Sequence, residues 1–145
     1  MDVVWHDRAF GELTTAELYA IVALRERVFV VEQQCLYVDA DGIDLYSRHL
    51  WGQRGEEIVA YCRIVPPHIK YPETSIGRVL VSSEHRREGL GKQLMQRAIT
   101  AVGPGPIRIG AQAYLENFYR ELGFAPASAP YIDVGIPHLE MVRAA

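Results

Sequence analysis

The sequence predicts a mixed α/β sheet in a single domain that spans residues 1–145. Three observations support this expectation. At 145 residues the chain has the length of one domain. Three strand patterns follow one another in the middle of the chain, which favours antiparallel pairing, and a helix pattern between two later strand patterns predicts a crossover connection. The predicted order is β-α-β-β-β-α-β-α-β-β.

The first predicted elements are a short strand at residues 3–5 and a helix that begins near Thr14. Thr14 and Glu17 have the spacing of a capping box, in which the two side chains satisfy free backbone amides at a helix start. Apolar residues then recur at helical spacing. Arg25 lies on the same apolar stripe, so it must either extend to solvent or pair with a buried carboxylate. Glu32 and the aspartates of the next loop are candidate partners.

The next segment, residues 35–47, is a loop rich in Asp and Gly. It does not match a calcium-binding EF-hand loop, because in the run that begins at Asp39 the glycine is fourth rather than sixth. We expect a solvated turn here; the alternative is that Asp41 and Asp44 form an acidic rim that attracts a cationic amine. Strands are expected at residues 49–53, 58–65 and 75–82, with a tight turn between the first two.

The C-terminal part predicts a helix over residues 89–102, a strand over residues 107–110 and a short helix over residues 115–122. Gly123 follows the short helix, as is common at helix C-termini. Two final strands are expected near residues 129–132 and 138–143.

Composition argues against several classes of protein. The formal charge is −3 without a basic run, which disfavours nucleic acid as a partner. No apolar stretch approaches the ~20 residues of a membrane span, and the N-terminus does not resemble a signal peptide, so we expect a cytoplasmic protein. Cys35 and Cys62 fit that compartment as reduced thiols, and Cys62 is expected to pack in the core. No His/Cys cluster has the spacing of metal ligands, so no metal is expected.

A phosphate-binding loop is predicted where a strand leads into the second long helix. The strand ends in Val79, Leu80 and Val81, and the loop residues are Arg86, Arg87, Glu88, Gly89, Leu90, Gly91 and Lys92. A helix start presents unpaired amides and partial positive charge, which favour an anionic phosphate, and glycines let it approach the backbone. A Walker A loop would need glycine in place of Arg86, and a dinucleotide fingerprint would need glycine in place of Leu94. Both motifs are therefore excluded.

This Arg-x-x-Gly-x-Gly pattern resembles the pyrophosphate loop of the GNAT family of N-acetyltransferases. A second stretch, residues 110–124, resembles the family's strand that leads into a short helix, with matches at Asn117, Phe118, Tyr119 and the closing Gly123 and Phe124. Residues 25–33 and 35–44, His49, and residues 110–113 and 135–138 are similar to the ElaA-like subgroup, so the resemblance covers nearly the whole chain. It implies the acyl-CoA N-acyltransferase fold with two splayed central strands.

The resemblance also implies how acetyl-CoA binds and reacts. The pantetheine arm would pair with residues 79–81, Asn117 would hydrogen-bond that arm, and Tyr119 would lie near the thioester sulfur. A phenol, with a pKa of about 10, can share a proton with a departing thiolate, whose thiol has a pKa of about 8.5. The amide of Val81 can stabilise the oxyanion. We expect direct attack by an amine in a ternary complex, because no cysteine is placed for a covalent acetyl-enzyme.

A general base must accept a proton from the amine, which is mostly protonated at about pH 7. Glu32, just past the first helix, is the first candidate, with a structural carboxylate as the alternative. His49 is the second, because of its intrinsic pKa, and His138 is a weaker one. The acceptor, a small molecule or a peptide amine, is not identified by these residues.

Two other functions remain open. A non-catalytic acyl-CoA-binding module would keep the phosphate loop and could dispense with Tyr119. An acyl-homoserine-lactone synthase-like enzyme would share the helix with Arg and Phe followed by an acidic loop, but those enzymes lack the well-formed glycine loop. The family often forms homodimers through its C-terminal strands, and residues 130–141 could supply such an edge.

Overall fold

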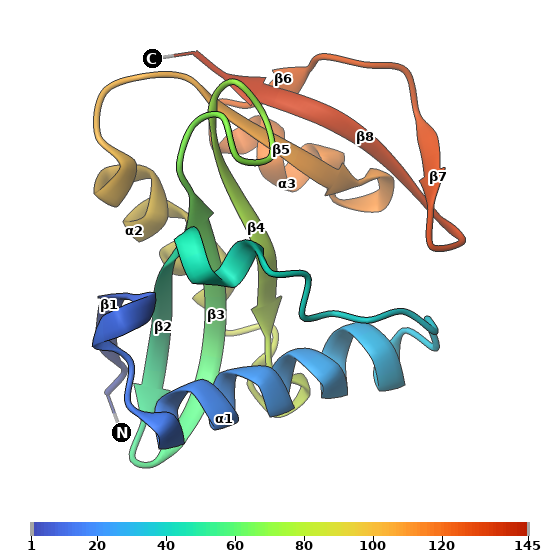
Figure 1. Cartoon of the computed structure of the whole chain (residues 1–145). Coiled ribbons are helices and arrows are strands. Elements are labelled where there is room, and N and C mark those ends of the chain that lie inside the picture. Colours follow the sequence, from blue (N-terminus) through green and yellow to red (C-terminus); the bar gives the residue numbers. More distant parts are fainter. Residues whose placement is uncertain (1, 145) are drawn as a thin grey trace.

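A computed structural model describes residues 2–144 of the chain, which form one eight-stranded sheet (Figure 1). The order is β1-β2-β3-β4-β5-β8-β6, and β7 pairs with β8. Only the β4–β5 pair is parallel; α2 connects these two strands, so the predicted mixed sheet and crossover are confirmed. The strands are β1 (Val4–Ala9), β2 (Arg48–Arg54), β3 (Glu57–Val65), β4 (Thr74–Val81), β5 (Ile107–Gln112), β6 (Ala125–Pro126), β7 (Tyr131–Asp133) and β8 (Ile136–Arg143). The helices are α1 (Thr15–Arg25), α2 (Leu90–Val102) and α3 (Glu116–Glu121).

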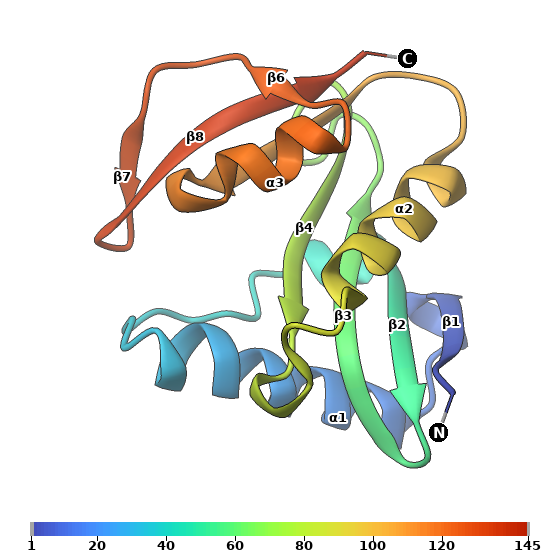
Figure 2. The same ribbon diagram turned by 180° about the vertical axis from the view of Figure 1, so that it is seen from behind.

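The helices cover opposite faces of the sheet. α1 lies on one face, and α2 and α3 lie on the other, as the two opposite views show (Figures 1 and 2). β3 is buried on both faces, which explains its continuous apolar sequence. Cys62 of this strand packs in the core beneath α2, as expected, whereas Tyr61 packs beneath α1.

Local signals at the start of the chain are largely confirmed. Thr14 accepts a hydrogen bond from the Glu17 amide, and the Glu17 carboxylate accepts one from the Thr14 amide, as a capping box requires. The tight turn between β2 and β3 also forms, with Arg54 opposite Glu57. β1 is longer than predicted, because polar residues continue its pairing with β2 at the edge of the sheet.

The end of the first helix differs from the expected regular pattern. After Arg25 the chain continues as a π-helical segment, Glu26–Glu32. The amide of Cys35 donates to the carbonyl of Val30 at 3.0 Å, the five-residue spacing of a π-helix. The wider turn brings Val28, Phe29 and Glu32 to the wall of the cavity described below.

The two central strands are splayed, as the resemblance implied. β4 and β5 pair only at Thr74–Ile107 and Ser75–Arg108, after which the described strands separate. On its other side β4 pairs with β3 through a register shift near Arg78, whose φ is +50°. Such a bulge bends a strand and changes the direction of its side chains. The diverging strands form the frame of the functional site.

Candidate functional site

A cavity of about 430 Å³ lies between the diverging halves of the sheet. Its wall combines β4, β5, α3, the π-helical segment and the β7–β8 hairpin. The predicted site residues that line it are Glu32, Val79, Leu80, Val81, Arg86, Gly91 and Tyr119. The cavity lining does not include Arg87, Glu88, Gly89, Leu90, Lys92, Asn117 or His49. The structure therefore brings together the strand, the arginine that opens the loop and the tyrosine.

The backbone of β4 presents a free edge to this cavity. The amide of Ser82 donates to the carbonyl of Val59 at 2.9 Å, and Ala60 stands opposite Val81 in the register. In the alternating antiparallel pattern, the amide and carbonyl of Val81 must then point away from β3. The Val81 carbonyl accepts a hydrogen bond from Nε of Arg86 at 3.0 Å, which confirms this direction. An extended ligand can pair with this edge as an added strand does.

The start of α2 offers an anion-binding position next to that edge. Gly89 is the N-cap residue with a φ of +76°, and no side chain caps the helix. The first amides of a helix have no partner within it, so those of residues 90–92 remain available to a ligand. A Cβ built on Gly91 would lie 3.7 Å from the side chains of Val81 and Phe118, so larger side chains would fill this space. These features fit the pyrophosphate of an acyl-CoA.

Arg86 and Glu32 form an ion pair across the cavity wall. The guanidinium contacts the two carboxylate oxygens at 2.5 and 3.1 Å, and both side chains are about 40% exposed, at 41% and 39%. The pair joins the loop before α2 to the π-helical segment. The sequence analysis assigned Arg86 to the phosphates of the cosubstrate and Glu32 to the acceptor amine. In the structure the two side chains contact each other directly.

Tyr119 projects from α3 into the same cavity and is 6% exposed. Its ring packs edge-on against Phe118 and Phe124, at centroid distances of 5.1 and 6.0 Å. Burial raises the pKa of Tyr119 above its ordinary value, so the phenol stays protonated at neutral pH. Within residues 2–144 no group hydrogen-bonds its hydroxyl. The hydroxyl is therefore a proton donor that the described residues leave without a partner.

His49 is not placed to act on a substrate in this cavity. It is completely buried, with Nδ1 2.7 Å from the Tyr61 hydroxyl and Nε2 3.0 Å from the Asp44 carbonyl. Burial lowers the pKa of His49, which keeps the ring neutral. We therefore correct its prediction as a second candidate base. The position of a histidine near a strand start does not indicate which way its ring points, and here it points into the fold.

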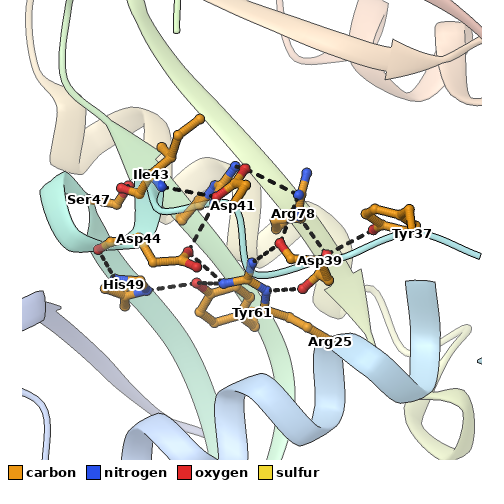
Figure 3. Close-up of polar contacts among 11 residues, drawn as sticks. Arg25, Tyr37, Asp39, Asp41, Ile43, Asp44, Ser47, His49, Tyr61 and Arg78 are labelled. Carbon is orange, nitrogen blue, oxygen red and sulfur yellow. Dashed lines mark hydrogen bonds and ion pairs between the residues drawn. The ribbon is translucent and has the colours of Figure 1, made fainter. Parts of the chain in front are cut away.

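The acidic loop is an internal ion network rather than a solvated turn or an acidic rim (Figure 3). Nε of Arg25 lies 2.6 Å from Asp39, and its Nη1 lies 2.6 Å from Asp44. The ion pair expected for Arg25 is thus confirmed with the loop aspartates. Glu32, the other candidate partner, binds Arg86 instead.

Two further arginines complete this network. Arg63 contacts Asp41 at 2.7 Å and Asp44 at 3.0 Å, and Arg78 contacts Asp39 at 2.8 Å and Asp41 at 3.3 Å. Three arginines therefore balance three aspartates. Burial disfavours charge on Asp44, but the hydrogen bond and charge of Arg25, with those of Arg63, hold the pKa of that carboxyl below its usual range. The two expectations for this loop, a solvated turn and an acidic rim, are wrong because the arginines lie beneath it.

Sequence reasoning missed several residues of the cavity wall. They include Tyr37, Arg78, Gln112, Tyr114 and Phe118. The Tyr37 hydroxyl donates to Asp39 at 2.8 Å, so the ion network fixes one part of the wall. Phe118 belongs to the matched helix motif but received no site role, whereas Arg78 reaches the wall through a strand bulge that no sequence pattern indicates.

Two further features lie outside this cavity. Among the described residues, Glu57, Glu84 and His85 form the one group close enough to hold a metal ion, but His85 is already hydrogen-bonded to Arg54 and Glu57. In the part of the chain that the structure describes, no helix has the length and apolar character to cross a membrane.

Comparisons with known proteins agree with this geometry. Residues 25–145 match the family model of the acetyltransferase (GNAT) domain. The chain is 44% identical to Escherichia coli ElaA over 147 residues, covering 97% of this chain and 96% of that protein. The crystal structure of ElaA superposes with a TM-score of 0.93 at 41% identity, over 98% and 99% of the two chains.

Two other solved structures resemble the chain to different degrees. An acyl-CoA N-acyltransferase from Pseudomonas aeruginosa has a TM-score of 0.95 at 40% identity, over 99% and 100% of the two chains. The CoA-dependent acyl-homoserine lactone synthase BjaI has a TM-score of 0.79 at 18% identity, over 97% and 82%, and shares the fold alone. The chain therefore belongs to the GNAT family of acetyltransferases, within its ElaA-like subgroup, and is an acyltransferase.

Proposed function

We propose that this chain transfers an acetyl group from acetyl-CoA to a primary amine by direct attack in a ternary complex. The observation that carries the proposal is that Tyr119, whose hydroxyl has no hydrogen-bond partner among the described residues, lines the same cavity as Val81, whose amide points away from β3. A binding module would need the backbone edge but not the tyrosine.

Acetyl-CoA supplies a thioester whose carbonyl carbon can be attacked. The backbone of residues 79–81 pairs with the pantetheine arm, and the amides at the start of α2 receive the pyrophosphate. Arg86 adds a positive charge once it exchanges Glu32 for phosphate. Exposed Arg87 and Lys92 add attraction from outside the cavity. We leave Asn117 out of this site because it is exposed and does not line the cavity.

The residues around the thioester supply a hydrogen-bond donor and an acid. The Val81 amide faces the open side of β4 and can donate to the oxygen that develops negative charge during attack. Tyr119 can donate its hydroxyl proton to the departing sulfur, since burial keeps the phenol protonated. This arrangement favours enzyme over sensor, and an acyl-homoserine-lactone synthase is supported by likeness of fold alone.

We place the reaction in the cytoplasm and expect no metal. Both cysteines are unpaired and buried, as is usual in a reducing compartment. The acceptor in this proposal is a small molecule or a peptide that carries a free amine.

An acceptor screen tests this function. The wild-type chain is incubated with acetyl-CoA and a mixture of spermidine, free amino acids and a lysine-containing peptide, while release of the CoA thiol is followed. We expect thiol release that depends on the mixture, and one product that is heavier by one acetyl group in mass spectrometry. Binding of acetyl-CoA, measured by titration calorimetry, is the control. Binding without acceptor-dependent release would contradict the enzyme and favour the sensing module.

A further inference from the structure

His138 is the one histidine that lines the cavity among the residues the structure describes. It lies in β8 opposite Gln112 of β5 and is half-buried. Its Nδ1 lies 2.7 Å from the carbonyl oxygen of Ile136. A carbonyl can only accept, so Nδ1 carries the proton and Nε2 carries the lone pair.

The orientation of this ring is held from a second side. The Tyr131 ring of β7 stacks on it at a centroid distance of 6.0 Å and an angle of 21°. Within residues 2–144 no group hydrogen-bonds Nε2. His138 therefore has an oriented ring with a lone pair on Nε2 that lacks a described partner, and the residue lines the cavity that Tyr119 also lines.

We propose that Nε2 of His138 is the general base that accepts a proton from the acceptor amine, an inference that rests on the proposed N-acetyltransferase function. The other two candidates are placed elsewhere. Glu32 contacts Arg86, the residue that we assign to the phosphate, and His49 is buried outside the cavity with both ring nitrogens bonded.

The protons and electrons of the transfer balance with this assignment. The acceptor arrives as an ammonium and leaves as an amide, so its nitrogen loses two protons. His138 takes one and releases it to solvent, which frees the lone pair that forms the bond between nitrogen and the carbonyl carbon. The bond between carbon and sulfur then breaks, and sulfur keeps its electron pair. Tyr119 gives its proton to that sulfur and regains the second proton that nitrogen loses.

Other titratable groups surround His138 and must stay unchanged in a test of its role. On its own hairpin, Tyr131 and Asp133 lie on β7, and Glu140 on β8 is paired with Arg108 of β5. The remaining titratable residues of the cavity wall are Glu32, Cys35, Tyr37, Arg78, Arg86, Tyr114 and Tyr119.

The test replaces only the titrating atom of His138. In His138→Asn the side-chain amide can still donate to the Ile136 carbonyl, but no atom takes the place of Nε2. His68→Asn is the matched control, because His68 is exposed, lies outside the cavity and has a φ of +69°, which asparagine tolerates. Thiol release with the amine mixture is measured from about pH 5.5 to 9.

We expect His138→Asn to lower kcat by about 100-fold or more, the usual contribution of a general base. The rise of kcat with pH on the acid side should disappear, and the Kd for acetyl-CoA should stay the same. His68→Asn should behave as the wild type does. An unchanged pH profile in His138→Asn, or loss of the acid limb in Glu32→Gln instead, would overturn the inference.

A measurement without turnover separates this inference from the proposed function. Two-bond proton–nitrogen correlations in the folded wild-type chain report which ring nitrogen of His138 carries the proton. We expect the proton on Nδ1 in the neutral ring; a proton on Nε2 would overturn the inference even if the chain is an active acetyltransferase. Absence of acceptor-dependent release in the wild type would instead overturn the proposed function, and the base with it.

Discussion

The ion network beneath the acidic loop and the cavity beside it differ in how their polar groups are paired. In the network, Arg25 (Figure 3) and Arg63 are 1% exposed, and each is paired with carboxylates of the same chain. By contrast, the hydroxyl of Tyr119, which lines the cavity, and the first amides of α2 next to it have no described partner. A search for buried charged residues alone would have selected the network as the candidate functional site. Nε of Arg63 is also buried in the network without a hydrogen-bond partner among the described residues, but Arg63 does not line the cavity. We therefore take groups without a described partner that line a cavity, rather than buried charge, as the indication of a ligand site.

The two regions are connected through shared residues. Arg78 and Tyr37 belong to the cavity wall, and both contact Asp39 of the network. A paired network of this kind contributes little net stability compared with an apolar core, but breaking one member leaves uncompensated charge. We infer that the network fixes the loop, and with it one side of the cavity.

Removal of one carboxylate from the network should have the largest effect on stability. Asp44 accepts from Arg25 at 2.6 Å and from Arg63 at 3.0 Å. Asp44→Asn leaves both guanidinium groups short of negative charge, so we expect the free energy of unfolding to fall by about 3–5 kcal/mol. Urea denaturation followed by circular dichroism measures this loss.

Asp7→Asn is the matched control, because Asp7 forms a partly exposed ion pair with Arg48 at the sheet edge. It should cost at most about 1 kcal/mol. The low pKa of Asp44 in the folded chain means that its contribution is complete above the unfolded pKa of about 3.9 and declines as the pH falls below it. The difference between wild type and Asp44→Asn should therefore shrink in acid. Equal losses of stability in Asp44→Asn and Asp7→Asn at neutral pH would mean that the buried network contributes no more than an ion pair at the sheet edge.

The sequence predicted the frame of the fold because its signals are local. The capping box at Thr14, the turn before Glu57 and the glycine loop before α2 each lie within a few residues. The ion network could be predicted only in part. Arg25 on an apolar stripe demanded a carboxylate, but Arg63 sits in a strand that reads as apolar, and its partners lie far away in the sequence.

For the candidate site, too, local features could be predicted from the sequence and long-range contacts could not. Tyr119 and Gly91 belong to short motifs and line the cavity as expected. The orientation of His49 and the pairing of Glu32 with Arg86 depend on how distant elements pack, which one sequence does not encode in a local pattern. For the same reason no local pattern shows that the ring of His138 is held by its own hairpin.

Tyr119→Phe tests the role of the cavity directly. Loss of the hydroxyl removes the proton donor but keeps the ring packed against Phe118 and Phe124. We expect kcat to fall about 100-fold while the Kd for acetyl-CoA changes little. Thiol-release kinetics and calorimetry measure the two quantities. Tyr19→Phe, on an exposed tyrosine of α1, is the control; equal kinetics in both variants would refute the acid role.

Gly91→Val should weaken cosubstrate binding without harming the fold. The new methyl groups would extend past a Cβ that already contacts Val81 and Phe118 at 3.7 Å. We expect the Kd for acetyl-CoA to rise about tenfold, equivalent to about 1.4 kcal/mol, with unchanged or higher thermal stability, because valine suits a helix better than glycine does. Gly11→Val, where no atom lies within 4 Å of the added Cβ, is the control. Unchanged affinity for acetyl-CoA in Gly91→Val would indicate that the phosphate does not bind at the start of α2.

Glu32→Gln should have the smallest effect on the Kd for acetyl-CoA, and the direction of the change distinguishes two roles of the carboxylate. If acetyl-CoA takes Arg86 away from Glu32, then neutralising the carboxylate removes a competitor for the guanidinium. A partly exposed ion pair contributes at most about 1 kcal/mol, so the Kd should fall by up to about fivefold in calorimetry. Glu116→Gln is matched to it, since Glu116 pairs with Arg120 on α3 outside the cavity at similar exposure. Weaker binding in Glu32→Gln would mean that the carboxylate orients Arg86 toward the phosphate instead of competing with it, and the ion pair would then belong to the bound state.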